Sequence, residues 1–322
     1  MVHVRKKQTD SQMFFASVTV LYWSRHYNKG MQCDLHVHTR HSGMCTIPLL
    51  RAVCRECYNE PPAVYEKLKR LGMDLVTITD HDSIDGLEEL RSRPDFFLSE
   101  EVTCQLPSGT QLHVGVYDIT DRDHIELQRR RSDFEALLAW LGERDLFFSA
   151  NHVFSSLTGR RAIEDFELFA SAFPALETRN GHMLPRANEN AAALADYAGR
   201  AEVGGSDAHA MASVGCAYTV VPRARSRHEY LEGLRLGLGK VRGEAGGFRK
   251  LTRDVLWIGW HMVRANPWTL PLVPLAPAVP LVILWNYAQE SVFARWWMAQ
   301  YLQARAARGG NRSAERAAEV AA

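Results

Sequence analysis

Each short apolar run between residues 32 and 209 ends in imidazole or carboxylate side chains, and this feature constrains the fold more than any other. The runs alternate with helix-like stretches, an order that favours a parallel α/β sheet. A closed barrel gathers the C-terminal ends of its strands around one mouth, whereas an open doubly wound sheet concentrates its site at one switch point. The polar residues are His36, His38, Asp80, His81, Asp82, Glu101, His113, Asn151, His152, Glu177, Asn180, Asp207 and His209. The sequence therefore predicts an α/β fold closed into a barrel, with its site at the mouth.

Local patterns predict the elements of this barrel. Residues 74–79 are continuous and β-branched, as a strand buried on both faces should be. Residues 61–72 begin with two prolines and end in glycine, which indicates a helix. The turn signal at 106–109 predicts a hairpin between its flanking strands. We expect one long helix over 124–145, strands over 146–154, 174–180 and 201–209, and a helix over 184–199.

The residue types at the run ends are those that bind metal ions. Because side chains alternate along a strand, Asp34, His36 and His38 share one face. Imidazole and carboxylate groups together bind zinc, manganese or iron. A single histidine at a strand end is more often a satisfied polar residue than a ligand. Six of the 13 histidines lie at strand ends, however, so a chance arrangement is a poor explanation.

Carboxylates can serve such a site in two ways. A carboxylate can bridge two cations, which imidazole cannot, and Glu101 and Asp207 are the candidates for this role. Other carboxylates orient metal-bound histidines from behind. Asp34, Asp80 and Asp82 are the candidates for that second role.

The motifs DLHVHT, TDHD, EVT with HVGVYDI, NHV and GGSDAH occur in this order, and ETRNGHMLPRANENAAALA precedes the last of them. In this respect residues 32–240 resemble the PHP (polymerase and histidinol phosphatase) superfamily. The resemblance implies a distorted (β/α)7 TIM-like barrel that holds two or three divalent cations and hydrolyses phosphoesters. The metal ligands that it implies by position are His36, His38, His81, Glu101, His113, His152, Asp207 and His209. Those that we expect to be catalytic are His36, His38, Glu101, Asp207 and His209.

One loop departs from the family pattern. Family members often carry an acidic residue in the loop after the HxHT motif, and Gly43 occupies that place here. Glycine has no side chain with which to bind a metal ion. Either His41 replaces the acid, or a third metal is weak or absent.

These residues predict a metal-dependent phosphoric ester hydrolase in which a metal-activated hydroxide attacks phosphorus. The expected substrate is a small phosphomonoester, a nucleotide or an oligonucleotide end. Arg40, Arg179 and His182 are candidate phosphate contacts, and the alternative for each is a solvated surface cation. Two other classes stay open: a PHP-like metal-binding module that regulates or recruits, and a similar barrel that hydrolyses a non-phosphate bond.

Composition excludes some functions and compartments. A net charge of +1 and a pI of about 7.7 give no strong nucleic-acid-binding signal. No Walker A, GxGxxG or GxSxG motif is present, so nothing indicates ATP, nicotinamide or a serine nucleophile. The lone CxxC pair, Cys54 and Cys57, is weak evidence for zinc and fits thiols in a reducing cytoplasm. Residues 1–31 form an N-terminal extension that makes a poor signal peptide, because Arg25, His26 and Lys29 follow its apolar run.

The composition changes after residue 245. Six of the eight tryptophans follow this point, and no charged residue lies between Ala265 and Gln289, a length that could cross a bilayer. Prolines at every third position from Pro271 to Pro280 predict an extended, polyproline-like connector between helices over 248–265 and 281–307.

Tryptophan and basic residues beside an apolar segment are typical of an interfacial membrane anchor. The alternative is a helical hairpin that packs on the barrel or on a second copy of the chain. We therefore expect a barrel over 32–244, a helical hydrophobic extension over 245–308 and a disordered tail over 309–322. The extension would contact a membrane surface or a second copy through 250–308, and the protein would be cytoplasmic or peripheral at the inner face of a membrane.

Overall fold

Five strands form the main sheet of the computed structural model, which describes residues 30–159 and 161–321. Their spatial order follows the chain: β2 (Ser99–Gln105), β3 (Gln111–Tyr117), β4 (Phe147–Ala150), β5 (Ala175–Asn180) and β6 (Ala201–Gly205). The predicted hairpin is present as β2 and β3, and β4 also pairs antiparallel with β3. Only β4, β5 and β6 pair in parallel, so the predicted parallel sheet is in fact mixed.

A second, smaller sheet contains β1 (Met31–Cys33), β7 (Ala217–Val221) and β8 (Lys240–Gly243) in the order β1-β7-β8. Both pairings in this sheet are antiparallel. This sheet pairs the start of the described chain with β7, which follows the GGSDAH motif at residues 204–209. That motif therefore lies next to His36 and His38.

The described residues contain no continuous closed sheet, so the mixed α/β class is confirmed but the predicted closed barrel is not. Residues 74–81 are extended, yet they form only isolated parallel bridges, from Val76 to Phe96 and from His81 to Glu101. Here side-chain oxygens accept hydrogen bonds from backbone N–H groups that would donate to backbone carbonyls in a regular sheet. Val37 N donates to Thr79 Oγ1 at 3.0 Å, and Thr39 N donates to Asp80 Oδ1 at 2.5 Å.

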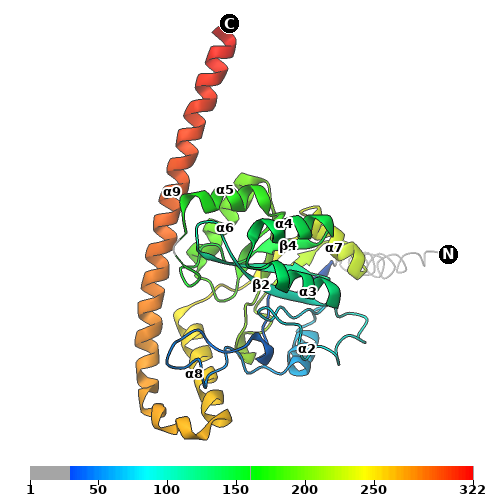
Figure 1. Ribbon diagram of the computed structural model, residues 1–322, viewed down its shortest axis with the longest axis vertical. Coiled ribbons are helices and arrows are strands. Elements are labelled where there is room, and N and C mark those ends of the chain that lie inside the picture. The colour runs from blue at the N-terminus through cyan, green and yellow to red at the C-terminus, as the bar shows by residue number, and fades with distance from the viewer. Residues whose placement is uncertain (1–29, 160, 322) are drawn as a thin grey trace, which may run out of the picture.

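Helices surround the strands (Figure 1). Their bounds are α2 (Pro61–Arg70), α3 (Asp121–Arg130), α4 (Phe134–Glu143), α5 (Ile163–Ala172), α6 (Pro185–Ala198) and α7 (Arg227–Arg235), with short 3-10 turns η1 (Arg40–Ser42) and η2 (Met211–Ser213). The predicted helices near 61–72 and 184–199 are present as α2 and α6. The single long helix over 124–145 was wrong, because Asp133 accepts a hydrogen bond from Ala136 N and so caps the start of a separate helix, α4.

The C-terminal extension is a helical hairpin made of α8 (Phe248–Ala265), η3 (Pro267–Ala278) and α9 (Val279–Ala321). Figure 1 shows α9 as a long rod along one side of the domain, with α8 and the turn at its lower end. Pro271, Pro274 and Pro277 lie in a 3-10 helix rather than in the predicted extended connector, and Pro280 lies in the first turn of α9. A 3-10 helix has three residues per turn, so prolines spaced by three share one face and keep their usual φ.

Helix α9 is fastened to the domain by buried aromatic side chains. Trp297 is fully buried and its ring meets the rings of Phe154 and Phe166. Tyr301 Oη donates to the backbone oxygen of Ala193 in α6 at 3.3 Å. The central part of α9 is therefore a component of the domain core.

Candidate metal centre

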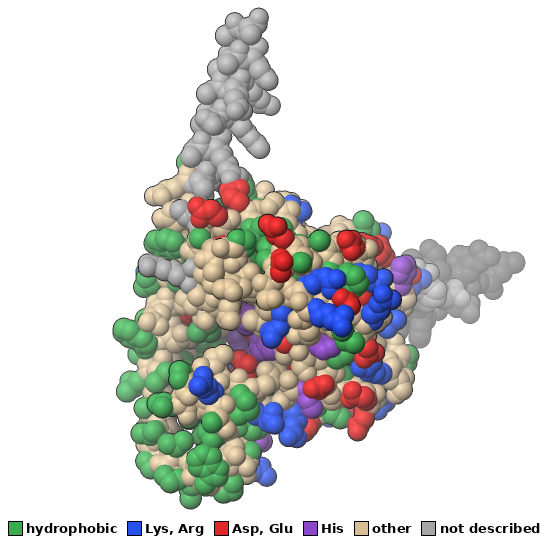
Figure 2. Space-filling model, viewed as in Figure 1, with side chains coloured by type: hydrophobic (Ala, Val, Ile, Leu, Met, Phe, Trp, Pro, Cys, Tyr) green, Lys and Arg blue, Asp and Glu red, His purple; other side chains and the backbone are tan. Residues whose placement is uncertain are grey.

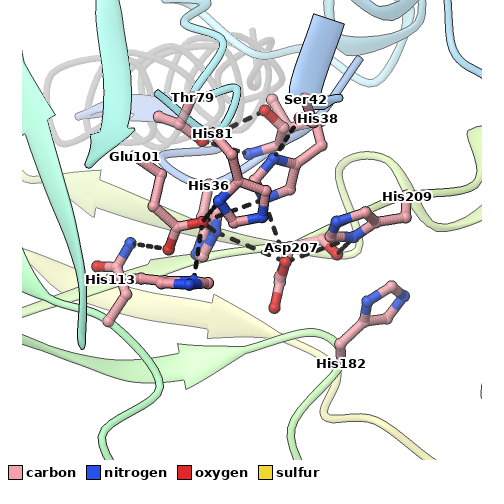
Figure 3. A network of polar contacts seen from close by, with 12 residues as sticks. His36, His38, Ser42, Thr79, His81, Glu101, His113, His182, Asp207 and His209 are labelled. Atoms are coloured by element: carbon pink, nitrogen blue, oxygen red, sulfur yellow. Dashed lines mark hydrogen bonds and ion pairs between the residues drawn. The ribbon is translucent and has the colours of Figure 1, made fainter. Parts of the chain in front are cut away.

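The predicted ligands converge from separate strands on one place (Figure 3). His36 and His38 follow β1, and the isolated bridge between His81 and Glu101 aligns the next two segments. The remaining ligands come from β3 and from the ends of β4 and β6: His113, His152, Asp207 and His209. All eight belong to groups in which the ligand atoms lie within 4.8 Å of one another. We call these eight residues the imidazole cluster.

Three atoms of the imidazole cluster have the spacing of a single ion's ligands, and a fourth lies beside them. His36 Nε2 lies 3.1 Å from Glu101 Oε2 and 3.5 Å from Asp207 Oδ1. His38 Nε2 lies 3.5 Å and 3.3 Å from the same two oxygens. Ligands of a tetrahedral ion with bonds of about 2.0 Å stand about 3.3 Å apart. His36, His38 and Asp207 form one group whose ligand atoms all lie within 4.8 Å of one another, and so fit around one divalent cation, with Glu101 facing both imidazoles.

Three of these atoms are buried without a hydrogen-bond partner among the described residues: His36 Nε2, His38 Nε2 and Glu101 Oε2. An unsatisfied buried polar group costs about 1–3 kcal/mol. Because these atoms converge instead of pointing at separate partners, a cation between them would satisfy all three at once. The donor set of imidazoles and carboxylates suits zinc, manganese or iron.

Glu101 also faces a second group of imidazoles. Its carboxylate lies 3.1 Å from His81 Nδ1, 3.6 Å from His113 Nδ1 and 3.2 Å from His152 Nε2. Together with His36 and His38, five imidazoles therefore surround this one carboxylate. This placement is what a bridging role for Glu101 requires.

A carboxylate that we did not predict lies beside a third group. Glu56 Oε2 is 3.8 Å from His81 Nε2, and Glu56 Oε1 is 3.7 Å from His209 Nε2. These distances are too long for hydrogen bonds, and His209 Nε2 is buried without a hydrogen-bond partner among the described residues. Glu56 could have been noticed in the sequence, because it is an acidic residue 13 positions after Gly43 in the same loop.

The structure explains why the acid is absent from position 43. Gly43 has φ of 92° and ψ of −153°, a backbone conformation that glycine adopts and other residues avoid. His41, the alternative ligand, has its ring against Gly86, where a Cβ atom would meet His41 Nε2 at 2.3 Å. His41 belongs to none of the candidate ligand groups among the described residues.

One of the three predicted orienting carboxylates acts on a ring of the imidazole cluster. Asp80 accepts hydrogen bonds from Thr39 and from Ser42 Oγ at 2.6 Å, and Ser42 Oγ lies 3.0 Å from His38 Nδ1. The prediction was wrong for Asp34 and Asp82, which accept hydrogen bonds from backbone amides and not from imidazole rings. Asp34 accepts from His36 N, Ser206 N and Gly215 N; Asp82 accepts from Thr103 N and pairs with Arg131.

Glu177 performs the orienting role that we assigned to other residues. Its carboxylate accepts from His36 Nδ1 at 2.8 Å, which leaves His36 Nε2 free to face the centre. It also accepts from His152 N at 3.0 Å and from Asn180 Nδ2 at 2.8 Å. Glu177 was visible in the sequence as a polar strand end, but its partner could be identified only in the fold.

Neutral amides hold the two central carboxylates. Asn151 Nδ2 donates to Glu101 Oε1 at 2.8 Å, and Ser149 Oγ in turn donates to Asn151 Oδ1 at 2.7 Å. Asn180 Nδ2 donates to Asp207 Oδ2 at 3.0 Å. In each case the other carboxylate oxygen, Oε2 or Oδ1, points to the histidines.

Burial and charge set different protonation states within the imidazole cluster. Burial lowers the pKa of His36 and His152, but the Glu101 carboxylate outweighs it and raises both, so these two rings would release a proton when a cation binds. Burial lowers the pKa of His38 to about 3 and that of His113 to about 4, so both rings are neutral at pH 7. Burial alone would raise the pKa of Glu101 and Asp207, but the nearby imidazoles, His36 first, hold both well below their usual values. Neutral imidazoles and ionised carboxylates are the forms that bind divalent cations.

The predicted phosphate contacts lie in different surroundings. Arg40 is half exposed and pairs with Glu60 at 2.7 Å. Arg179 has a buried Nε atom without a hydrogen-bond partner among the described residues. His182 is the one that reaches the imidazole cluster, because its ring lies 5.7 Å from that of His209 and the two group with Asp207.

The comparisons with known proteins agree with this geometry. Residues 185–237 match the family model described as PHP-associated. A search of curated protein sequences finds no match. The solved structure of PsfC from Pseudomonas syringae PB-5123 is 17% identical, covers 73% of this chain and 99% of its own, and has a TM-score of 0.51. That value indicates a shared fold.

Two further solved structures are more distant. One is from Bifidobacterium adolescentis and is described as a candidate metal-dependent phosphoesterase; it is 16% identical over 56% of this chain and 88% of its own, with a TM-score of 0.41. The other is the lesion-specific endonuclease PfuEndoQ from Pyrococcus furiosus, 16% identical over 66% of this chain and 57% of its own, with a TM-score of 0.44.

Fold and site together define a mixed α/β protein whose strand ends carry a histidine and carboxylate cluster suited to divalent metal ions. The ordered motifs and the match over residues 185–237 name the class more closely. Residues 185–237 match the PHP-associated family, and the motifs before them resemble those of the PHP superfamily in type and order.

Proposed function

We propose that this protein is a metal-dependent hydrolase of phosphoric esters, with a small phosphomonoester, a nucleotide or an oligonucleotide end as substrate. The observation that carries the proposal is the convergence of buried ligand atoms from His36, His38 and Glu101, without hydrogen-bond partners among the described residues, beside Asp207. Burying these imidazole and carboxylate atoms without partners costs free energy, which bound cations would offset. Several cations close together would also neutralise the negative charge of a phosphoryl group.

Some residues would bind the cations, and others position the side chains that bind them. His36, His38, Glu101 and Asp207 would hold one cation, and Glu101 with His113 and His152 would hold a second. Divalent cations bound there supply charge neutralisation at the phosphoryl oxygens and activation of water at neutral pH. Glu177, Ser42 and Asn151 fix the rings and the carboxylate, so the ligand atoms need no rearrangement on binding.

His182 is the residue best placed to meet the substrate. Its ring lies beside His209 at the edge of the imidazole cluster, and its Nε2 is 3.3 Å from the carboxylate of Asp254 in α8. From this position an N–H group of the His182 ring would donate to a phosphate oxygen. Figure 2 shows histidine side chains inside a hollow on this face of the molecule, so the site is open to solvent.

The arrangement of the segments also supports a distorted seven-segment barrel. Isolated bridges continue the main sheet from β2 through His81 and Val76, and from the end of β6 through the bridge between Ala208 and Val37. The hydrogen bond from Thr79 N to Val37 O at 3.0 Å joins the two extended segments.

A substrate panel tests the proposed reaction. Protein stripped by a chelator and reloaded separately with zinc, manganese or iron should hydrolyse at least one of a set of phosphomonoesters, cyclic nucleotides and short oligonucleotides. The stripped protein should be inactive. Released phosphate or nucleotide is the readout. Hydrolysis of amides or lactones but of no phosphoester, or metal binding without any hydrolysis, would overturn the proposal.

Glu56 is our proposed replacement for the acid that Gly43 lacks. Its two carboxylate oxygens lie between His81 and His209, at separations that suit ligands sharing one ion. Because Gly43 and Glu56 belong to the same loop, the chain can supply the missing ligand from the far end of that loop. We infer that the site holds a third cation through His81, His209 and Glu56.

Replacing Glu56 with glutamine should therefore reduce bound metal by about one ion per chain, because the amide is a poor ligand and carries no charge. Elemental analysis of protein equilibrated with a small excess of metal measures this without any activity assay. Glu60→Gln is the matched control, since Glu60 lies in the same loop but pairs with Arg40 at the surface. Equal metal content in Glu56→Gln and the parent protein would refute the third site.

A further inference from the structure

The turn of the C-terminal hairpin exposes an unusual amount of apolar surface. We call residues 267–289 the apolar tip. Trp268 is 68% exposed, Trp285 67%, Leu275 64% and Leu281 69%. Figure 2 shows these elements as a dense apolar area at the lower left, where Figure 1 places η3 and the start of α9. Soluble surfaces seldom gather so many large apolar side chains without a partner.

The apolar surface covers the outward side of the tip, while Ile283 of α9 is buried on its inner side. Successive residues of α9 point in directions about 100° apart, and Leu281, Val282, Leu284 and Trp285 are all exposed. A helix that packs on a second protein usually keeps a polar side towards water. The tip has no charged residue. The most apolar stretch of 18 residues within 267–303 has a mean hydropathy of 1.7, and 11% of it is buried. The exposed side of the tip thus offers no charged group to a protein partner, and an apolar medium fits it better than a protein face does.

Charged side chains begin where the tip meets the rest of the hairpin. Arg264 lies exposed in the last turn of α8, and Arg295 lies exposed on α9. Tryptophan at the boundary, with arginine further out, matches the layering of an acyl region and the headgroups above it. Prolines at 271, 274 and 277 turn the chain within the apolar segment. The tip is therefore shaped to enter one leaflet and return.

The base of the same hairpin contacts the metal site. Asp254 of α8 accepts hydrogen bonds from Ser213 Oγ and from His182 Nε2. Glu290 of α9 accepts from Ser156 N at 3.0 Å and from Ser156 Oγ, in the loop that begins with His152. Both helices that carry the tip are thus bonded to loops that line the imidazole cluster.

We propose that the apolar tip inserts into the surface of a lipid bilayer and holds the mouth of the metal site beside it. The insertion depends on the tip alone, so it stands or falls independently of the reaction that the site catalyses. The position of the site adds a consequence that rests on the proposed function: phosphoesters at the membrane surface would reach it first.

Vesicle flotation of the full-length chain tests the insertion. The parent protein should float with phosphatidylcholine vesicles, and more completely when phosphatidylglycerol is added. Leu275→Glu with Leu281→Glu should leave at least about tenfold more protein in the bottom fraction, because each glutamate opposes entry into the apolar layer. Leu49→Glu with Leu236→Glu is the matched control, since these leucines are 92% and 70% exposed on the domain, and it should float like the parent.

The same variants separate lipid from a second copy of the chain. Light scattering without lipid should give the same mass for the parent and for both double variants, and their metal content should be equal, which shows that the tip substitutions leave the fold intact. A parent protein that stays in the bottom fraction with both vesicle compositions would overturn the proposal. So would a parent dimer that the tip substitutions convert to a monomer, because the tip would then be an interface between copies.

Discussion

Glu101→Gln should lower metal-dependent phosphoester hydrolysis by about three orders of magnitude, which corresponds to about 4 kcal/mol of transition-state stabilisation. It should also lose bound metal. The reason is geometric, because the Glu101 carboxylate lies within 3.1 to 3.6 Å of nitrogens from His36, His81, His113 and His152. An amide keeps the shape but removes the charge that those ligand sets share. Steady-state kinetics and elemental analysis of the same preparations measure the two losses.

Glu100→Gln is the control for this experiment. Glu100 precedes Glu101 on β2, is equally buried, and points the other way, where it accepts from His124 and Gln128. It should retain bound metal and most of the activity. If Glu101→Gln keeps its metal and its rate, the imidazole cluster is not the catalytic centre. Equal losses in both variants would mean that the effect comes from burying an altered side chain in β2.

Trp297→Ala should cost about 3–5 kcal/mol in the free energy of unfolding, because it removes a fully buried indole from between α9 and the domain. Urea denaturation followed by circular dichroism measures the loss. Limited proteolysis should also cut within α9 faster in the variant, since the helix loses its largest contact with the core.

Trp296→Ala supplies the comparison at the neighbouring position. Trp296 is 37% exposed, so its replacement should cost much less, about 1 kcal/mol. Similar costs for the two substitutions would contradict the placement of α9 against α5 and α6. A loss in Trp297→Ala that leaves metal content unchanged would show that the hairpin stabilises the domain without shaping the imidazole cluster.

Much of the site could be predicted from sequence, for a physical reason. Side chains alternate along a strand, so His36 and His38 had to share a face, and strand ends meet at one edge of an α/β sheet. The eight ligands that the family resemblance implied by position do lie together in the fold. Rules for neighbouring residues could not predict which carboxylate accepts a hydrogen bond from which imidazole ring, because that depends on how separate segments pack. Glu177 therefore binds the ring of His36, whereas Asp34 accepts only from the His36 backbone N.

Local rules also failed where a short-range bond competed with a pattern. The apolar period over 124–145 continued through Asp133, but its side chain caps a new helix there. The prolines from 271 to 280 predicted an extended connector, but Pro271, Pro274 and Pro277 lie in a 3-10 helix, because a spacing of three residues also suits its three residues per turn. Residues 74–81 had the composition of a strand, yet Thr79 and Asp80 use their side chains where a ladder would use backbone.

The sequence by itself determined the chemistry of this protein: imidazoles and carboxylates at strand ends, in an order typical of the PHP superfamily, followed by an uncharged apolar stretch. The tertiary structure decided which atoms face one another. It placed Glu56 beside His81 and His209, which lie far from it in the sequence, and it fastened α8 and α9 to the loops of the imidazole cluster through Asp254 and Glu290. Periodicity is a property of neighbouring residues, whereas a ligand set is closed by segments that meet only when the chain has folded.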